Sequence, residues 1–190
     1  LTQTESDFGA QYDSLADMVS FGVAPAVIAY GWGLNNLGKL GLAAAFVFTS
    51  CAALRLARFN VQSGLRESSF RSFIGLPSPA AAALVVGLVW STHLLETSVP
   101  LSVIGTLVTV SAGLLMVSSF KYPSFKQIDF RGKVPFFVIF CMVMAFVLIS
   151  IDPPRILFMI AVLFCFYAPA RWSWDLFQSK FWRHKSETND

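Results

Sequence analysis

Long stretches of this chain carry almost no charged side chains. Across Met18–Leu54 the only charged residue is Lys39, and none occurs in Val134–Ile151 or Ile156–Ala170. About 20 apolar residues, at a rise of 1.5 Å per residue, cross a hydrocarbon layer of about 30 Å. These stretches predict membrane-spanning segments and exclude a soluble enzyme, a disordered chain and a disulfide-stabilised scaffold.

Composition supports the same interpretation. Charged residues make up 13% of the 190 residues and hydrophobic residues 55%, whereas a typical soluble domain has roughly 25% charged residues. The three cysteines lie inside apolar runs without CxxC spacing, which favours small buried side chains over a metal or redox site.

Prolines, glycines and charges divide the chain into six expected spans. Their approximate bounds are Gly9–Trp32, Leu37–Ala57, Pro79–Leu95, Leu101–Phe120, Val134–Ser150 and Ile156–Trp172. The runs are too long and too uniformly apolar for barrel strands, which alternate over about ten residues, so helices must satisfy the backbone in lipid. We expect an all-α polytopic transmembrane helical bundle over residues 1–171, followed by a cytoplasmic amphipathic tail over residues 172–190.

The basic residues predict the orientation. Twelve of the 14 Lys and Arg residues fall on one side of a six-span chain, and only Lys39 and Arg155 fall on the other. The positive-inside rule makes the basic side cytoplasmic. We therefore expect a multi-pass protein of the cell membrane. The net charge of +3 fits loops beside anionic lipid, and no nucleic-acid partner is expected.

Asp13 and Asp17 are the side chains best suited to chemistry. They lie four residues apart, directly before an uncharged run, so a helix places both carboxylates on one face. A charge at mid-membrane costs on the order of 2.5 to 3.5 kcal/mol and is retained where it pairs or lines a polar cavity. Two close carboxylates favour a cation such as Mg²⁺ or Mn²⁺. The spacing fits equally well with acids that interact with the dipole of a helix N-terminus.

A second candidate group lies at the end of the second expected span. Arg55 and Arg58 are three residues apart and are followed by Asn60. The planar donors of arginine suit phosphate or carboxylate. Two arginines that extend their head groups to the membrane surface explain the pattern as well.

Two prolines bracket Ser78 in the segment Gly75-Leu76-Pro77-Ser78-Pro79. Proline restricts the backbone and is favoured in the first turn of a helix. The segment predicts an extended turn that leads into the third span.

Gly9, Asp13 and Asp17 together form the pattern G-x3-D-x3-D. It resembles the second half of the signature of the CDP-alcohol phosphotransferase family, D-x2-D-G-x2-A-R-x8-G-x3-D-x3-D, and eight residues precede Gly9, as in the family spacer. The segments SDFGAQYDSLADMVSFGVAPA, LRLARFNV and FIGLPSPAAAA resemble the branch of the family that makes phosphatidylserine. We expect the first half of the signature to lie upstream of Leu1, and these 190 residues to be inactive alone.

The resemblance implies transfer of a phosphatidyl group from CDP-diacylglycerol to the hydroxyl of L-serine, with release of CMP. Asp13 then corresponds to the third signature aspartate, a ligand of a divalent metal, Mg²⁺ or Mn²⁺, beside the nucleotide. Asp17 corresponds to the fourth, which lies at the metal and acts as the general base. Gly9 would leave room for the nucleotide, and the family is typically homodimeric.

Zwitterionic serine needs a cation for its carboxylate. Arg55, Arg58 and Asn60 are the expected ligands of this carboxylate or of a phosphate, and Arg66 and Arg71 on the same side are equally suitable. The apolar spans would supply a groove for the acyl chains of CDP-diacylglycerol, surrounded by membrane lipids.

Other functions stay open at this stage. A different member of the same family would use glycerol phosphate or inositol as the acceptor alcohol. An ion-coupled membrane transporter would bind its coupling ion at Asp13 and Asp17, although the paired broken spans typical of transporters are absent from the sequence pattern. A third interpretation treats the two aspartates as surface acids without a ligand.

Overall fold

The computed structural model describes residues 7–64, 72–95, 97–123, 136–167 and 169. Within these ranges the chain is helical apart from one short antiparallel ribbon. The helical elements are α1 (Asp7–Met18), the π-helical turn η1 (Val19–Val23), α2 (Ala24–Trp32), the 3₁₀ turn η2 (Leu34–Leu37), α3 (Lys39–Gly64), α4 (Ser78–Thr92), α5 (Val99–Val117), α6 (Phe136–Ile151) and a last helix, Pro153–Tyr167. The ribbon pairs β1 (Ser72–Ile74) with β2 (Lys121–Pro123), and Phe73 lies opposite Tyr122.

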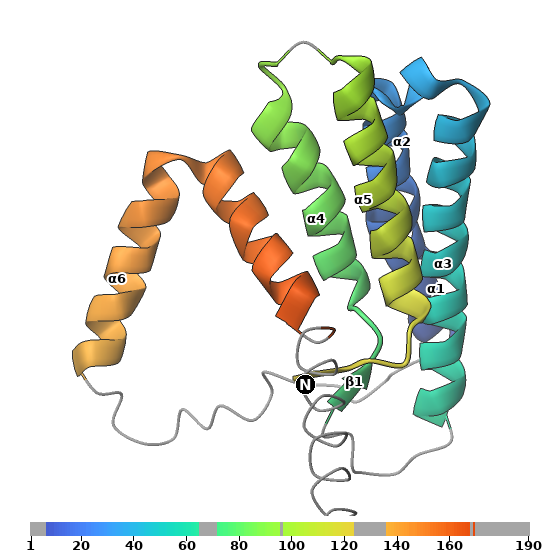
Figure 1. Cartoon of the computed structure of the whole chain (residues 1–190). Coiled ribbons are helices and arrows are strands. Elements are labelled where there is room, and N and C mark those ends of the chain that lie inside the picture. Colours follow the sequence, from blue (N-terminus) through green and yellow to red (C-terminus); the bar gives the residue numbers. More distant parts are fainter. Residues whose placement is uncertain (1–6, 65–71, 96, 124–135, 168, 170–190) are drawn as a thin grey trace, which may run out of the picture.

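Helices α2, α3, α4 and α5 form a closely packed bundle (Figure 1). Its core is rich in small residues, and it includes Ala44, Phe48, Ala52, Leu84, Val85, Ala112 and Met116. Gly113 of α5 lies so close to α3 that a Cβ atom there would be 3.2 Å from the Cα of Phe48. Small residues at such crossings let helix backbones approach, which is how membrane helices commonly pack.

Among the described residues, three helices are long and apolar enough to cross a membrane by length and composition, Phe8–Trp32, Lys39–Val61 and Val99–Val117. Three further apolar helices are shorter, Ser78–Thr92, Met142–Ile151 and Pro153–Tyr167. The predicted helical membrane class is confirmed. The count of six spans stays a prediction.

Helix α3 departs most from its expected bounds. The sequence pattern placed its end at Ala57, but the helix continues to Gly64. No proline or glycine lies between Gly41 and Gly64, so nothing interrupts the helical hydrogen bonds where the side chains become polar. Arg58 and Asn60 therefore lie on the helix and not beyond it.

Successive helices of the bundle run in opposite directions, which defines two ends (Figure 1). We call the end where α4 begins at Ser78 the proximal end, and α3 and α5 finish there. We call the end where α3 begins at Lys39 the distal end. The last helix also starts at the distal end, with Arg155 in its first turn. Lys39 and Arg155, the two basic residues predicted to lie opposite the others, thus both lie in the first turns of helices that start toward the distal end.

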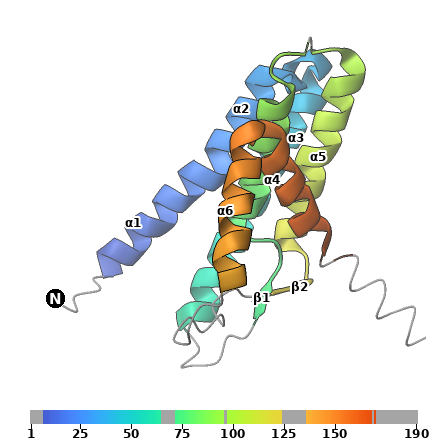
Figure 2. The same cartoon turned by 90° about the vertical axis from the view of Figure 1, so that its left-hand side faces the viewer.

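Helices α1 and α2 join through the π-helical turn, and α1 extends to one side, away from α4 and α5 (Figure 2). The backbone N–H of Ala24 donates to the carbonyl of Val19. Pro25 has no N–H for the carbonyl of Phe21, and the wider turn makes room for its ring. Gly22 of this turn packs on α3, where a Cβ atom would lie 3.1 Å from the Cβ of Ala52.

Candidate active site

Helices α1 and α3 lie antiparallel, and two contacts set their register. One is the close approach of Gly22 to α3. The other is a hydrogen bond in which Nδ2 of Asn60 donates to Oγ of Ser14 at 2.9 Å. Asp17 lies between these contacts, on the stretch of α1 that faces Arg55, and the two charges interact electrostatically. Helix packing thus brings together two residues that the sequence placed in separate candidate groups.

The two aspartates differ in their surroundings. Asp13 is exposed on α1, and Asp17, one turn further, is half-buried toward α3. Gly9 is exposed one turn before Asp13. The predicted arrangement of the three residues along one helix is confirmed, because α1 covers all of them without a break.

The acidic pair fits part of a site for a hard divalent cation. Asp13 and Asp17 supply carboxylate oxygens on successive turns, the donor type that Mg²⁺ and Mn²⁺ prefer. Within residues 7–64, 72–95, 97–123 and 136–167, no three His, Cys, Asp or Glu side chains gather closely enough to hold a metal ion. Two carboxylates are therefore the contribution of the described residues, and the remaining ligands must come from substrate, water or other residues.

Arg55 is held by α4. Its Nη1 donates to Oγ of Ser78 at 2.9 Å, and Ser78 is only 8% exposed. The Nε–H of Arg55 is buried without a hydrogen-bond partner among the described residues. A buried donor that lacks an acceptor costs about 1–3 kcal/mol, so an acceptor that reached this N–H would be bound favourably.

The segment before α4 is pinned to the end of α5. The N–H of Gly75 donates to the carbonyl of Phe120 at 2.8 Å, and the N–H of Leu76 donates to the carbonyl of Leu115 at 3.0 Å. Gly75 has a φ angle of +83°, and a Cβ atom there would collide with the carbonyl oxygen of Met116. Both its conformation and the lack of space therefore require glycine.

Two prolines lead from this segment into α4. Pro77 has φ −57° and ψ 135°, an extended conformation, and α4 starts at the next residue with a proline in its first turn. The predicted turn and helix start are confirmed. As a result, the backbone of Ser78 is fixed at a position where its hydroxyl contacts Arg55.

The remaining predicted ligands are spread more widely. Arg58 is exposed on α3, and Asn60 is exposed where it bonds Ser14. Arg66, Arg71 and the tail over residues 172–190 lie outside the described residues.

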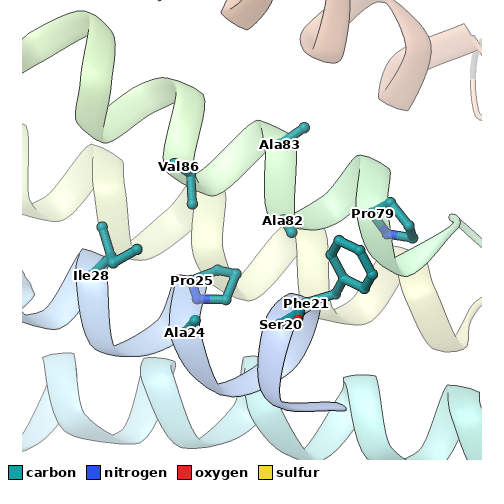
Figure 3. A pocket seen from close by; sticks show the side chains of 9 residues that line it. All are labelled: Ser20, Phe21, Ala24, Pro25, Ile28, Pro79, Ala82, Ala83 and Val86. Carbon is teal, nitrogen blue, oxygen red and sulfur yellow. The ribbon is translucent and has the colours of Figure 1, made fainter. Parts of the chain in front are cut away.

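An apolar groove between η1–α2 and α4 borders this polar group (Figure 3). It has a volume of about 280 Å³. Its lining residues are Ser20, Phe21, Ala24, Pro25, Ile28, Pro79, Ala82, Ala83 and Val86. Phe21 lies one turn after Asp17, and Pro79 directly follows Ser78, so the polar group lies next to one end of the groove.

The fold and the site define a helical membrane protein that carries an acidic pair and a half-buried arginine at one end of its bundle. Residues 1–115, which contain every site residue described above, match the CDP-alcohol phosphatidyltransferase family. Two relatives are named CDP-diacylglycerol–serine O-phosphatidyltransferase. The one from Helicobacter pylori strain J99 is 38% identical over 190 residues, which cover 98% of this chain and 76% of that protein.

The second, from Methanocaldococcus jannaschii, is 37% identical over 166 residues, which cover 87% of this chain and 71% of that protein. An archaetidylserine synthase of Methanothermobacter thermautotrophicus is 33% identical over 116 residues, covering 61% of this chain and 45% of that protein. The chain belongs to the CDP-alcohol phosphatidyltransferase family, as its aspartate pattern predicted.

Sequence reasoning missed two hydroxyls of this site. Ser14 accepts from Asn60 and donates to the carbonyl of Ala10 in its own helix, and Ser78 accepts from Arg55. The two prolines around Ser78 were the available signal for its buried, fixed position. Nothing in the sequence marks Ser14, since a serine on a helix surface is common.

Proposed function

We propose that this protein transfers a phosphatidyl group from CDP-diacylglycerol to the hydroxyl of L-serine and releases CMP. The observation that carries the proposal is the placement of Asp13 and Asp17 on successive turns of α1, with the charge of Asp17 near enough to Arg55 to interact with it, inside the region that matches the family. The printed names of the Helicobacter and Methanocaldococcus relatives support serine as the acceptor.

The chemistry assigns one step to Asp17. The hydroxyl oxygen of serine forms a bond to the phosphorus that carries the diacylglycerol. The bond from this phosphorus to the oxygen that bridges it to CMP breaks, and its electron pair leaves with CMP. The carboxylate of Asp17 takes the hydroxyl proton, and a positioned base of this kind typically accelerates a reaction by about 10²–10⁴-fold.

Asp13 and Asp17 are also the residues that would hold a divalent cation, Mg²⁺ or Mn²⁺, with Gly9 leaving room for the nucleotide. Such an ion, when bound, supplies neutralisation of the pyrophosphate and of the departing CMP. The exposure of Asp13 supports this role, because an accessible carboxylate can meet a cation that arrives with its substrate.

Arg55, Arg58 and Asn60 would bind the anionic groups of the substrates, the serine carboxylate or a phosphate. The unpartnered Nε–H of Arg55 supports this assignment, since guanidinium donors suit both anions. The apolar groove beside Phe21 and Pro79 would hold an acyl chain of CDP-diacylglycerol.

The proposed setting is the cell membrane, crossed six times, with the proximal end on the cytoplasmic side. The basic residues of the sequence support this orientation, and we propose that the protein works among membrane lipids as a homodimer, as is typical of its family.

Release of CMP from CDP-diacylglycerol tests the function. The assay offers L-serine, glycerol 3-phosphate or inositol as the acceptor, with and without EDTA. Because D-x2-D-G-x2-A-R is absent from these 190 residues, the chain is assayed alone and joined to a preceding segment that carries this motif. We expect the joined form to release CMP fastest with serine, and EDTA to abolish release. Faster release with either other alcohol would contradict serine as the acceptor.

A further inference from the structure

Ser78 is a buried polar residue whose hydroxyl is used between helices. A second buried hydroxyl, that of Thr109, donates to the carbonyl of Gly105 in its own helix, which is a local bond of a kind common in membrane helices. Oγ of Ser78 instead accepts a hydrogen bond from Arg55, 23 residues earlier in the chain. Its position depends on the pinned segment before α4, so it is more rigidly placed than a surface serine.

The bond to Ser78 determines which donors of Arg55 remain available. A guanidinium group is planar, so fixing one of its nitrogen atoms fixes the direction of the others. With Nη1 engaged by Ser78, the opposite edge carries Nε–H and Nη2, two donors that form no hydrogen bond with the part of the chain that the structure describes. The Nε–H of that edge is buried and unpartnered among the described residues, which favours an anionic acceptor brought by a substrate.

The location of this free edge suits the reaction. Arg55 and Asp17 lie on adjoining stretches of α3 and α1, between the Gly22 contact and the bond from Asn60 to Ser14, and their charges are near enough to interact. In serine the carboxylate and the hydroxyl sit on adjacent carbons. We expect an amino acid whose carboxylate is bound at Arg55 to place its hydroxyl on the α1 side of the guanidinium, where Asp17 lies, and a phosphate bound there to lie near the same carboxylate.

We propose that Ser78 is a positioning residue for phosphatidyl transfer, which holds the guanidinium of Arg55 so that its free edge binds a substrate anion beside Asp17. The anion is the serine carboxylate or a phosphate of CDP-diacylglycerol, which offer the same acceptor chemistry. The proposal rests on the proposed function and adds to it a residue that touches neither substrate.

The first test probes the environment of the Arg55 guanidinium and does not depend on catalytic activity. In protein labelled with ¹⁵N-arginine and held in detergent micelles, the Nε–H resonance of Arg55 is identified by its loss in Arg55→Lys. We expect Ser78→Ala to shift or broaden this resonance. Ser91→Ala is the matched control, because Ser91 also lies on α4 but its hydroxyl donates to Leu88 of the same helix. An Arg55 resonance that is identical in wild type and Ser78→Ala would overturn the proposal.

The second test separates binding from chemistry in the form that is active in the CMP-release assay. We expect Ser78→Ala to raise the KM of one substrate about tenfold, as for a weakened charged hydrogen bond, and to leave kcat within about threefold. A raised KM for serine identifies the carboxylate as the anion, and a raised KM for CDP-diacylglycerol identifies the phosphate. Ser78→Thr, which keeps the hydroxyl, should restore most of the lost affinity, and Ser91→Ala should behave as wild type.

The outcomes also distinguish this proposal from the function on which it rests. A Ser78→Ala protein that melts at a lower temperature but keeps both KM values would show a structural role only and overturn the positioning proposal. Wild-type protein that releases no CMP with serine would overturn the proposed function itself, whatever the behaviour of the Arg55 resonance.

Discussion

The two ends of the bundle are both joined by polar contacts between helices, but they use different chemistry. At the distal end, Nδ2 of Asn36 donates to Oγ of Ser102 at 3.2 Å and to the carbonyl of Thr97 at 3.3 Å. The hydroxyl of Thr97 donates to the carbonyl of Trp32 at 3.2 Å. All these groups are neutral, as is the buried Nε1 of Trp32, which has no hydrogen-bond partner among the residues that the structure describes.

The proximal end holds charged groups with unused hydrogen-bonding capacity. Within the described part of the chain, Arg55 keeps a buried N–H without an acceptor. Asp13 and Arg58 are exposed, and Asp17 is half-buried and interacts with the charge of Arg55. Charges near lipid are unfavourable unless they pair or serve a polar ligand. The difference shows that polar contacts between helices do not by themselves mark the site in this protein; two acidic side chains on one helix near a half-buried arginine do.

The largest expected effect is a loss of activity from a substitution at the proximal end. Asp17→Asn should lower the rate of CMP release by about 10²–10⁴-fold, because an amide does not accept the serine proton. The melting temperature in detergent should stay close to that of wild type, since the side chain is half-exposed. Retention of wild-type release in this variant would remove Asp17 from the mechanism.

The next largest effect is a loss of stability from a substitution at the distal end. Gly41 lies at the distal end, and a Cβ atom there would collide with the backbone carbonyl of Leu34. Gly41→Ala should therefore destabilise the protein by roughly 1–3 kcal/mol, measured by thermal unfolding in micelles. Gly31→Ala is the control, because nothing lies within 4 Å of its added Cβ, and a helical alanine is favoured by about 0.5–1 kcal/mol. Equal stability of the two variants would contradict the tight distal packing.

A smaller effect concerns cation binding. Asp13→Asn should weaken the binding of Mn²⁺ by about tenfold or more, since changes to groups that merely support a metal ligand already cost 10–100-fold. Electron paramagnetic resonance of free Mn²⁺ measures the binding. Asp152→Asn serves as the control, because Asp152 is a carboxylate at the distal end that pairs with Arg155 at 3.3 Å. Equal losses in both variants would indicate nonspecific attraction of the ion.

The smallest effect tests whether the distal contacts serve stability alone. Ser102→Ala removes the acceptor of Asn36 and should lower stability by about 0.5–1.5 kcal/mol, with CMP release per folded molecule unchanged. A loss of release at full stability would show that the distal end also takes part in function, and the contrast between the ends would fail.

Much of this architecture follows from local sequence patterns. The uncharged stretches predict helices because lipid leaves the backbone no other hydrogen-bond partners, and the spacing of Asp13 and Asp17 places them on one face by helical geometry alone. The end of α3 was predicted wrongly for a related reason. Hydropathy reports where side chains become polar, whereas the helix ends where its backbone hydrogen bonds stop, at Gly64.

The amino-acid sequence by itself determined the membrane class, the acidic pair and the family, and it predicts the separation of basic residues between the two ends. Only the tertiary structure decided that Asp17 lies near Arg55, that Asn60 bonds Ser14, and that the hydroxyl of Ser78 holds the guanidinium. The reason is physical. Periodicity and charge act over one or two helical turns, whereas these contacts depend on how closely separate helices approach, which small residues such as Gly22 and Ala52 set at their crossings.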